Sequence, residues 1–417
     1  MIHFHTHSSP HKERQQQSSP ANSHKKYFTL DLLRAFATLC VILVHTTERV
    51  YQFNLEAMPS YTLQRQLFAL TLFTIGRMGV PIFLFLTGYL LLNRTYNKEY
   101  TSIFYRRNFL CLLITSEIWI VLYNVFNSWF YRAPFRISEL LRNMFFLKET
   151  NMSHMWYIPV ILGLYLFIPF VSHAISESIK EDYPYFESII QKFLLCGIFF
   201  YLYVIPELNI IFQCNGAELF SILPSFSGGV YGFHLILGFL ICKRYFRRIP
   251  VPLCFCIGMS CFFLTVWLQF YSYQRNVGYN VWYNNATLLI TCLMMFEYIS
   301  RYEDEGTSMH STRRKAFFNK FRSGVFGKAI QTIARCSFGI YLIHNPINML
   351  LIRFFHTESA VLRLAIIGSM TFLFSFVIVW ILCKNKYIAK ILFNTNINNC
   401  KQPLSADSRA AFPGQSG

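Results

Sequence analysis

An arginine and a histidine lie eleven positions apart in the apolar stretch DLLRAFATLCVILVHTT, residues 31–47. At about 100° per residue this spacing is three helical turns plus roughly 20°, so Arg34 and His45 share one stripe of a helix, about 16 Å apart along its axis. An ionisable side chain at mid-depth in a membrane costs roughly 3 kcal/mol or more. A cost of that size is seldom kept without a use, so the pair predicts a functional polar face on the first helix.

Polar groups also interrupt later apolar stretches. Arg77 and Glu117 lie deep in the second and third stretches. The stretch ARCSFGIYLIHNPINML carries Ser337, Tyr341 and His344 at spacings of four and three, which places them on one helical face. We expect His344 at about the same depth as His45. Histidine titrates near neutral pH, so this set predicts a cavity whose centre can transfer protons.

One end of this cavity is expected to be cationic. Four arginines gather toward the end predicted to be cytoplasmic: Arg34, Arg106, Arg107 and Arg335. The fourth apolar stretch opens at the other end with Trp156 and Tyr157. A cationic inner mouth suits an anionic cytosolic ligand.

Ordinary packing offers a second interpretation for most of these residues. His45 could bond a neighbouring helix, and Arg34 could anchor its helix at the interface with a snorkelling head. Glu117 fits a structural role as well as a catalytic one. Arg77 is harder to explain in this way, because it lies too deep to snorkel. Interhelical hydrogen bonding or an aromatic belt would account for four others: Ser337, Tyr341, Trp156 and Tyr157.

The composition indicates an integral membrane protein. Of 417 residues, 54% are hydrophobic and only 14% are charged, too few charges for a soluble surface. The net charge of +18 does not indicate nucleic-acid binding, because the basic residues lie in loops between apolar stretches. Most of the 12 cysteines lie inside those stretches, and their spacing predicts neither a metal site nor a disulfide framework.

The fold class expected is an all-α integral membrane protein of about ten transmembrane helices, with both termini cytoplasmic. Basic segments at 94–107, 242–248 and 312–328 set this orientation. The fifth helix is expected to end at Pro206. The ten apolar stretches are 29–47, 67–93, 107–131, 155–172, 189–206, 225–242, 250–272, 280–300, 328–352 and 361–383.

The chain divides into one membrane domain and two short tails. Residues 1–28 are polar and predict a disordered cytoplasmic tail, residues 29–385 form the multi-pass domain, and residues 386–417 form a cytoplasmic C-terminal tail. No internal repeat is evident, which gives no support to an inverted-repeat transporter. A transporter or flippase of a glycan or other polar substrate remains the alternative function.

Four segments in order resemble the membrane-bound acyltransferase family 3, stand-alone type. They are LDLLRAFATLCVILVHT, GRMGVPIFLFLTGYLLL, HMWYIPVILGLYLFIPFV and SFGIYLIHNPI. The resemblance implies a cell-membrane O-acetyltransferase that uses acetyl-CoA as co-substrate, binds no cofactor, and acylates a hydroxyl of a surface polysaccharide or its lipid-linked precursor. The acceptor sugar and the oligomeric state cannot be read from the sequence.

The family motif of a basic residue, ten residues and a histidine matches Arg34 and His45. The resemblance implies that His45 is the base or the carrier of an acyl group, and that Arg77 stabilises an oxyanion or orients the sugar. Glu117 and His344 join the catalytic set. Acyl-CoA would be held by Arg34, Arg106, Arg107 and Arg335, although the family's Arg-x-x-Arg pattern is here an adjacent pair. The acceptor would be bound by Tyr341, Ser337, Trp156 and Tyr157.

Overall fold

The computed structural model describes residues 28–146, 152–180, 196, 199–217, 229–303 and 320–394. These residues form helices and connecting loops, without a strand, so the all-α prediction is confirmed for this part of the chain. The predicted N-terminal tail, except for residue 28, and residues 395–417 lie outside it.

The first half of the chain contains four long helical stretches, some of them divided into shorter elements. They are α1 (Phe28–Tyr51), α2 (Leu63–Arg77), α3 (Gly79–Leu91), α4 (Lys98–Phe104), the π-helix η1 (Tyr105–Phe109), α5 (Leu110–Tyr131), α6 (Ile137–Met144), the 3₁₀ turn η2 (Ser153–Trp156) and α7 (Tyr157–Lys180).

The second half continues the bundle. Its elements are the π-helix η3 (Phe200–Val204), α9 (Ile205–Cys214), α10 (Val230–Cys242), the 3₁₀ turn η5 (Tyr245–Arg248), α11 (Val251–Gln274), α12 (Ala286–Ser300), the 3₁₀ turn η6 (Arg301–Glu303), α14 (Val325–Phe354), α15 (Ala360–Leu382) and α16 (Lys386–Phe393).

Long apolar helices make the chain a multi-pass membrane protein. Among the described residues, six stretches are long and apolar enough to cross a membrane: Phe28–Tyr51, Leu63–Leu91, Lys98–Tyr131, His154–His173, Val251–Gln274 and Ala360–Leu382. Shorter apolar helices cover Leu202–Cys214, Val230–Cys242 and Ala286–Ser300. The 30-residue α14 is not one of the six, because polar residues interrupt its apolar sequence.

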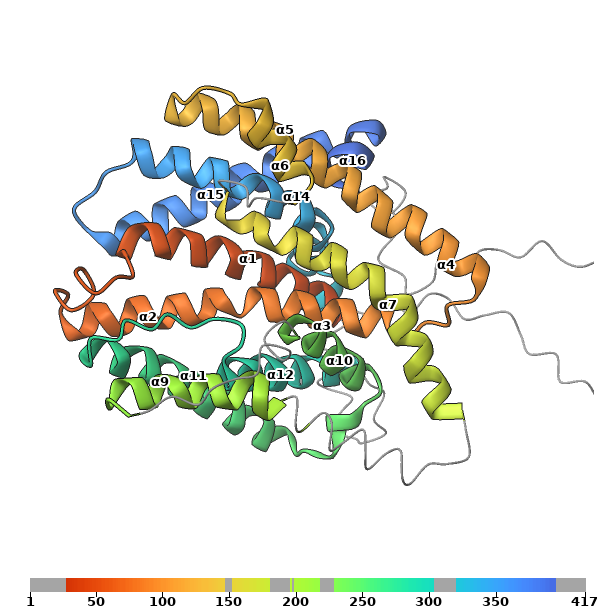
Figure 1. Ribbon diagram of the computed structural model, residues 1–417, viewed down its shortest axis with the longest axis horizontal. Coiled ribbons are helices and arrows are strands. Elements are labelled where there is room, and N and C mark those ends of the chain that lie inside the picture. The colour runs from red at the N-terminus through yellow and green to blue at the C-terminus, as the bar shows by residue number, and fades with distance from the viewer. Residues whose placement is uncertain are drawn as a thin grey trace, which may run out of the picture.

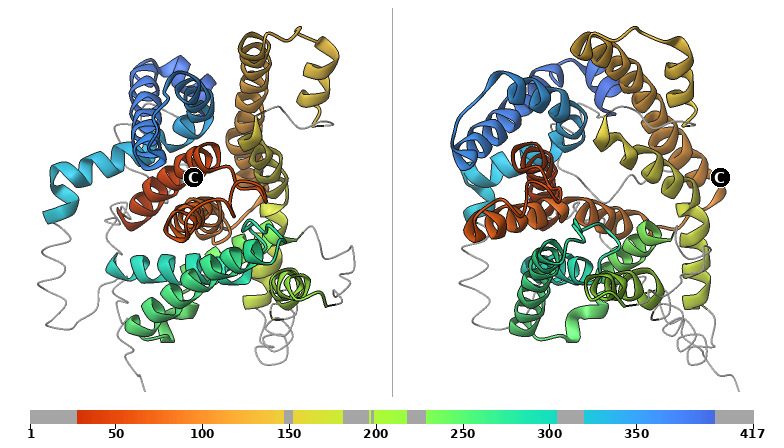
Figure 2. Two further views of the ribbon diagram at one scale, coloured as in Figure 1. Left: turned by 90° about the vertical axis from the view of Figure 1, so that its left-hand side faces the viewer. Right: turned by 60° about the vertical axis from the view of Figure 1, so that its left-hand side comes forward.

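Helix α1 is the centre of the bundle. It packs against α2 and α3 on one side and against α14 and α15 on another, and it also touches α12. Figure 1 shows α1 lying between the α2–α3 pair and the C-terminal helices, and Figure 2 shows α10, α11 and α12 gathered on the far side of α2. A polar stripe on α1 therefore faces protein rather than lipid.

The second predicted span is broken at Met78. The sequence predicts one helix over 67–93, whereas α2 ends at Arg77 and α3 begins at Gly79. Pro81 has no N–H to donate to the carbonyl of Arg77 four residues earlier, which accounts for the break. The break places Arg77 at the end of a helix.

Two other predicted boundaries are wrong. Helix α9 runs to Cys214, past the end expected at Pro206, because proline in the first turn of a helix loses no hydrogen bond. Helix α12 begins at Ala286 rather than near 280. The side chain of Asn285 caps it by accepting from the backbone N–H of Leu288 at 2.7 Å.

The segment assigned to the C-terminal tail from 386 onward begins with α16, which packs on α5. The indole of Trp119 donates to the carbonyl of Leu392 at 2.8 Å, and Thr115 donates to the carbonyl of Ile391 at 3.0 Å. Phe393 is 1% exposed. These contacts bring α16 against the membrane domain.

Helices α3 and α10 meet through two glycines. A Cβ on Gly238 would lie 2.1 Å from the carbonyl oxygen of Phe85, and a Cβ on Gly88 would lie 1.9 Å from that of Leu235. Small residues of this kind allow membrane helices to approach closely. Figure 1 shows α10 alongside α3.

We expect Gly238→Ala to force α3 and α10 apart and to lower the free energy of unfolding by about 1–3 kcal/mol. The measurement is the melting temperature of the purified protein in detergent. Gly368→Ala in α15 is the matched control, because nothing lies within 4 Å of its Cβ. Equal melting temperatures for the two variants would contradict the close approach.

Candidate active site

Three histidines from distant parts of the chain meet inside the bundle. The ring centroids of His45 and His344 are 5.4 Å apart, those of His45 and His154 are 6.2 Å apart, and those of His154 and His344 are 5.0 Å apart. Their exposed fractions are 9%, 0% and 2% for His45, His344 and His154. The structure thus brings together the two histidines that the sequence placed at equal depth, and adds a third from η2.

Hydrogen-bond partners fix the tautomers of the His344 and His154 rings. Nδ1 of His344 lies 2.6 Å from the carbonyl oxygen of Tyr341, which only accepts, so Nδ1 carries the proton. Nε2 of His344 is then a lone-pair acceptor, buried without a hydrogen-bond partner. For His154, Nδ1 accepts from the side-chain amide of Asn345 at 2.7 Å, and Nε2 donates to the hydroxyl of Tyr123 at 3.2 Å.

A carboxylate orients His45. Nδ1 of His45 donates to Oε2 of Glu48 at 3.2 Å, and the other oxygen of Glu48 accepts from Nη2 of Arg77 at 2.9 Å. Glu48 is one turn after His45 on α1, which makes this contact local. Because Nδ1 holds the proton, Nε2 of His45 carries a free lone pair and can act as a base.

Aromatic rings surround Arg77. Its guanidinium carbon lies 4.7, 4.5 and 5.5 Å from the ring centroids of Phe73, Trp282 and Tyr283. Nη1 donates to the hydroxyl of Tyr283 at 3.3 Å, and Nε is buried without a partner. Cation–π contacts and the Glu48 carboxylate together hold this charge within the bundle.

Helices α1 and α14 run parallel and are joined at one end by Arg49. Its guanidinium donates to the side-chain oxygens of Asn345 and, at 2.6 Å, Asn348. Asn348 in turn donates to the hydroxyls of Thr46 at 2.8 Å and Thr371 at 3.1 Å. This network fixes the register of α14 against α1, and so the position of His344 against His45.

A pocket of about 350 Å³ lies on one side of the histidines. We call it the Arg34 pocket. Its polar lining includes Arg34, Arg94, Tyr157, Ser337 and Tyr341. The hydroxyl of Tyr341 donates to the backbone carbonyl of His154 at 2.6 Å, so one side chain of the pocket lining contacts the histidine cluster. Four residues predicted from the sequence therefore line one cavity.

A second pocket of about 400 Å³ lies on the other side. We call it the Arg353 pocket. It is lined by Arg49 and Asn345, which are hydrogen-bonded to each other, together with Arg353, Tyr131 and Met152. Asn345 also donates to His154, so the histidine cluster stands between the two pockets.

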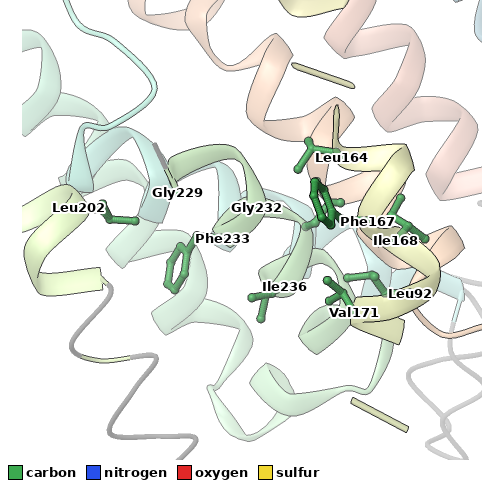
Figure 3. Close-up of a pocket in the computed structure, with 11 residues that line it drawn as sticks. Leu92, Leu164, Phe167, Ile168, Val171, Leu202, Gly229, Gly232, Phe233 and Ile236 are labelled. Carbon is green, nitrogen blue, oxygen red and sulfur yellow. The ribbon is translucent and has the colours of Figure 1, made fainter. Parts of the chain in front are cut away.

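A third pocket, of about 310 Å³, carries no group for chemistry. Figure 3 shows Phe167 and Ile168 of α7 together with Phe233 and Ile236 of α10 lining it. Its lining side chains are apolar, and an apolar surface of this kind suits lipid acyl chains.

Other predicted site residues lie apart from the three histidines. Arg106 and Arg107 are exposed on η1, and Arg335 is half-buried on α14. Glu117 is half-buried on α5, where its Oε2 has no hydrogen-bond partner. Trp156 stacks on Tyr283, with ring centroids 5.4 Å apart, and so joins the aromatic group around Arg77.

Glu48, Arg49 and His154 are among the members of the site that were not predicted from the sequence. Glu48 and Arg49 follow His45 within one turn, a signal that local spacing offers. His154 lies in a 3₁₀ turn before α7, and its burial depends on α5 and α14, which no local pattern reveals. Within the described ranges, no group of three or more His, Cys, Asp or Glu could hold a metal ion.

Comparison with known proteins identifies one family. Residues 27–380 match the family model described as an acyltransferase domain, Acyl_transf_3. The match covers all three histidines, the whole lining of the Arg353 pocket, and the Arg34 pocket except for Phe393 and Asn394. No curated protein and no solved structure matches the chain.

Proposed function

Because the chain belongs to the Acyl_transf_3 acyltransferase family, we propose that its site transfers an acetyl group from cytosolic acetyl-CoA to a sugar hydroxyl. The acceptor is a cell-surface polysaccharide or its lipid-linked precursor, and the enzyme works in the cell membrane. One observation carries the proposal: a cluster of three buried histidines stands between two separate pockets, each lined by arginines. Two substrates that meet from opposite sides need this arrangement.

The proposed orientation follows the positive charges. About ten transmembrane helices with both termini in the cytoplasm would place the basic segments 94–107, 242–248 and 312–328 inside. The Arg34 pocket then opens toward the cytosol and receives the donor. The Arg353 pocket opens toward the outer face and receives the acceptor.

In the donor pocket, Arg34 and Arg94 hold the phosphates of acetyl-CoA by charge-assisted hydrogen bonds. The pantetheine arm extends along α1 toward His45, about 16 Å from Arg34 by the helical rise. Ser337 and Tyr341 line the path, and Tyr341 marks its end at the histidines. Arg106 and Arg107, which are exposed, and Arg335 belong to the end of the protein that is predicted to be cytoplasmic. We propose that they attract the anionic donor.

The transfer step uses His45 as the base. Its Nε2 takes the proton from the acceptor hydroxyl as the oxygen attacks the thioester carbonyl. The carbon–sulfur bond then breaks, and the departing thiolate takes the proton from His45 to give coenzyme A and the ester. Glu48 stabilises the imidazolium and keeps its Nδ1 protonated, as the carboxylate does in a catalytic triad.

Arg77 and His344 are proposed to act around this step. The unpartnered Nε–H of Arg77 is a donor available to the oxyanion. Nε2 of His344 is an unpartnered acceptor beside His45, suited to receiving a hydrogen bond from the acceptor sugar. Trp156, with Trp282 and Tyr283, walls the site.

We expect His45→Gln to lower the rate of acetyl transfer by about 10²- to 10⁴-fold, since it removes the general base. The assay follows label from radiolabelled acetyl-CoA into alkali-labile ester of the host surface-glycan fraction, in membranes with equal amounts of protein. His356→Gln is the control, because His356 is exposed beyond α14. Near-normal transfer by His45→Gln would overturn the assignment.

The same assay tests Glu48. Because Glu48 acts through His45, Glu48→Gln is expected to lower kcat while the KM for acetyl-CoA stays constant. The double variant His45→Gln, Glu48→Gln should be no slower than His45→Gln alone, since residues that act as a unit are not additive. Independent losses in the double variant would show that Glu48 acts elsewhere.

Arg34 is expected to act on the donor only. Loss of a charge-assisted contact in Arg34→Gln should raise the KM for acetyl-CoA by about 10- to 100-fold and change kcat less. The control is Arg65→Gln. Arg65 lies on α2, where its guanidinium stacks on the Tyr61 ring. An unchanged KM in Arg34→Gln would remove Arg34 from the donor site.

A further inference from the structure

Two arginines from different helices line the Arg353 pocket. Arg49 comes from the last turn of α1 and Arg353 from the last turn of α14. Both line the same pocket of about 400 Å³. Two like charges facing one cavity repel each other unless an anion lies between them.

Neither arginine has a carboxylate within ion-pairing distance among the described residues. Arg49 donates to two neutral amides, those of Asn345 and Asn348. Arg353 donates to the backbone carbonyl of Phe130 at 3.1 Å, and its guanidinium lies 5.2 Å from the Phe130 ring centroid. The nearby carboxylate of Glu48 is engaged by His45 and Arg77. The pocket therefore keeps an excess of positive charge.

The pocket also offers a surface for a sugar ring. Phe130 and Tyr131, at the end of α5, line it, and Tyr131 is 58% exposed. An aromatic face accepts the C–H face of a sugar, while guanidinium groups bind carboxylate or phosphate through two parallel hydrogen bonds. Both kinds of contact are present at one opening.

A single side chain connects this pocket to the histidines. Asn345 lines the pocket, accepts from Arg49 and donates to His154. Along α1, Arg49 is four residues from His45, about 6 Å by the helical rise. A ligand held by Arg49 and Arg353 thus lies within one sugar residue of the base.

Resting on the function proposed above, we propose that the Arg353 pocket is the acceptor subsite and that it selects a glycan carrying a negative charge. The charge is a sugar carboxylate or a phosphate ester close to the hydroxyl that is acylated. Arg353, at the opening, makes the first contact, and Arg49 fixes the charged group beside the histidine cluster.

The first test measures binding to the full-length protein in detergent, without acetyl-CoA. Isothermal titration with methyl glucuronide, methyl glucoside and glucose 1-phosphate compares a carboxylate, a neutral sugar and a phosphate. We expect one or both anionic sugars to bind at least about tenfold more tightly than the neutral one, and to lose affinity as salt is added. Whichever anion binds more tightly identifies the charged group. Equal binding of all three, or no binding, would overturn the proposal.

Variants locate the site. Arg353→Gln should remove the preference for the anion, and Arg353→Lys should retain part of it, because lysine keeps the charge but loses the two-pronged geometry. Arg275→Gln is the matched control: Arg275 is exposed and stacks on Tyr271, 5.4 Å from its ring centroid. Melting temperatures check that each variant is folded. If folded Arg353→Gln still prefers the anionic sugar, the anion-binding site lies elsewhere.

Acetyl transfer separates this proposal from the function on which it rests. Transfer to the glucuronide and the glucoside with equal kcat/KM would leave the acyltransferase standing and overturn the anionic subsite. Binding of the anionic sugar that depends on Arg353, with no acetyl transfer from acetyl-CoA, would support the subsite and overturn the proposed reaction.

Discussion

Ionisable groups inside an apolar helix bundle must find partners there, and the carboxylate of Glu48 meets this requirement for two of them. It accepts from His45 through one oxygen and from Arg77 through the other. Each contact depends on a different feature of the fold. His45 is reached within α1, whereas Arg77 is reached because α2 ends beside α1. Without Glu48, a guanidinium and an imidazole would face each other with no counter-charge, and buried charges left unpaired are strongly destabilising.

The general architecture could be predicted from the sequence because it follows from local patterns. Apolar stretches of about 20 residues predict membrane helices, and the spacing of Arg34 and His45 predicts one polar stripe on α1. The expected common depth of His45 and His344 agrees with the 5.4 Å between their rings. Arg34 was predicted to bind the donor, and Ser337, Tyr341 and Tyr157 were predicted to bind the acceptor, yet all four line one pocket. The assignment of these three residues to the acceptor therefore changes in the function proposed above.

What the sequence could not supply depends on contacts between distant segments. His154 stands at the start of an apolar stretch and looks like an interfacial residue, yet Tyr123 of α5 and Asn345 of α14 enclose it. Arg94 lines the Arg34 pocket, although the sequence placed it only in a basic segment, 94–107, that was expected to set the orientation. Asn394 and Phe393 complete that pocket from a segment that composition assigned to a tail. The proline in α2–α3 can be read in the sequence. Its consequence, a helix end at Arg77, became clear only from the structure, which also shows the partners of Arg77.

The parallel packing of α1 and α14 explains why the site has three levels. Along α1 the order is Arg34, His45, Arg49, and along α14 it is Ser337, His344, Arg353. Because the two helices run in the same direction, residues of equal rank meet: Arg34 and Ser337 line one pocket, the two histidines face each other, and Arg49 and Arg353 line the other pocket. An antiparallel pair would bring Arg34 toward Arg353 and mix the two pockets. The register fixed by Arg49, Asn345 and Asn348 therefore does more than stabilise the bundle: it keeps the two pockets apart and leaves the histidines as the place where their contents can meet.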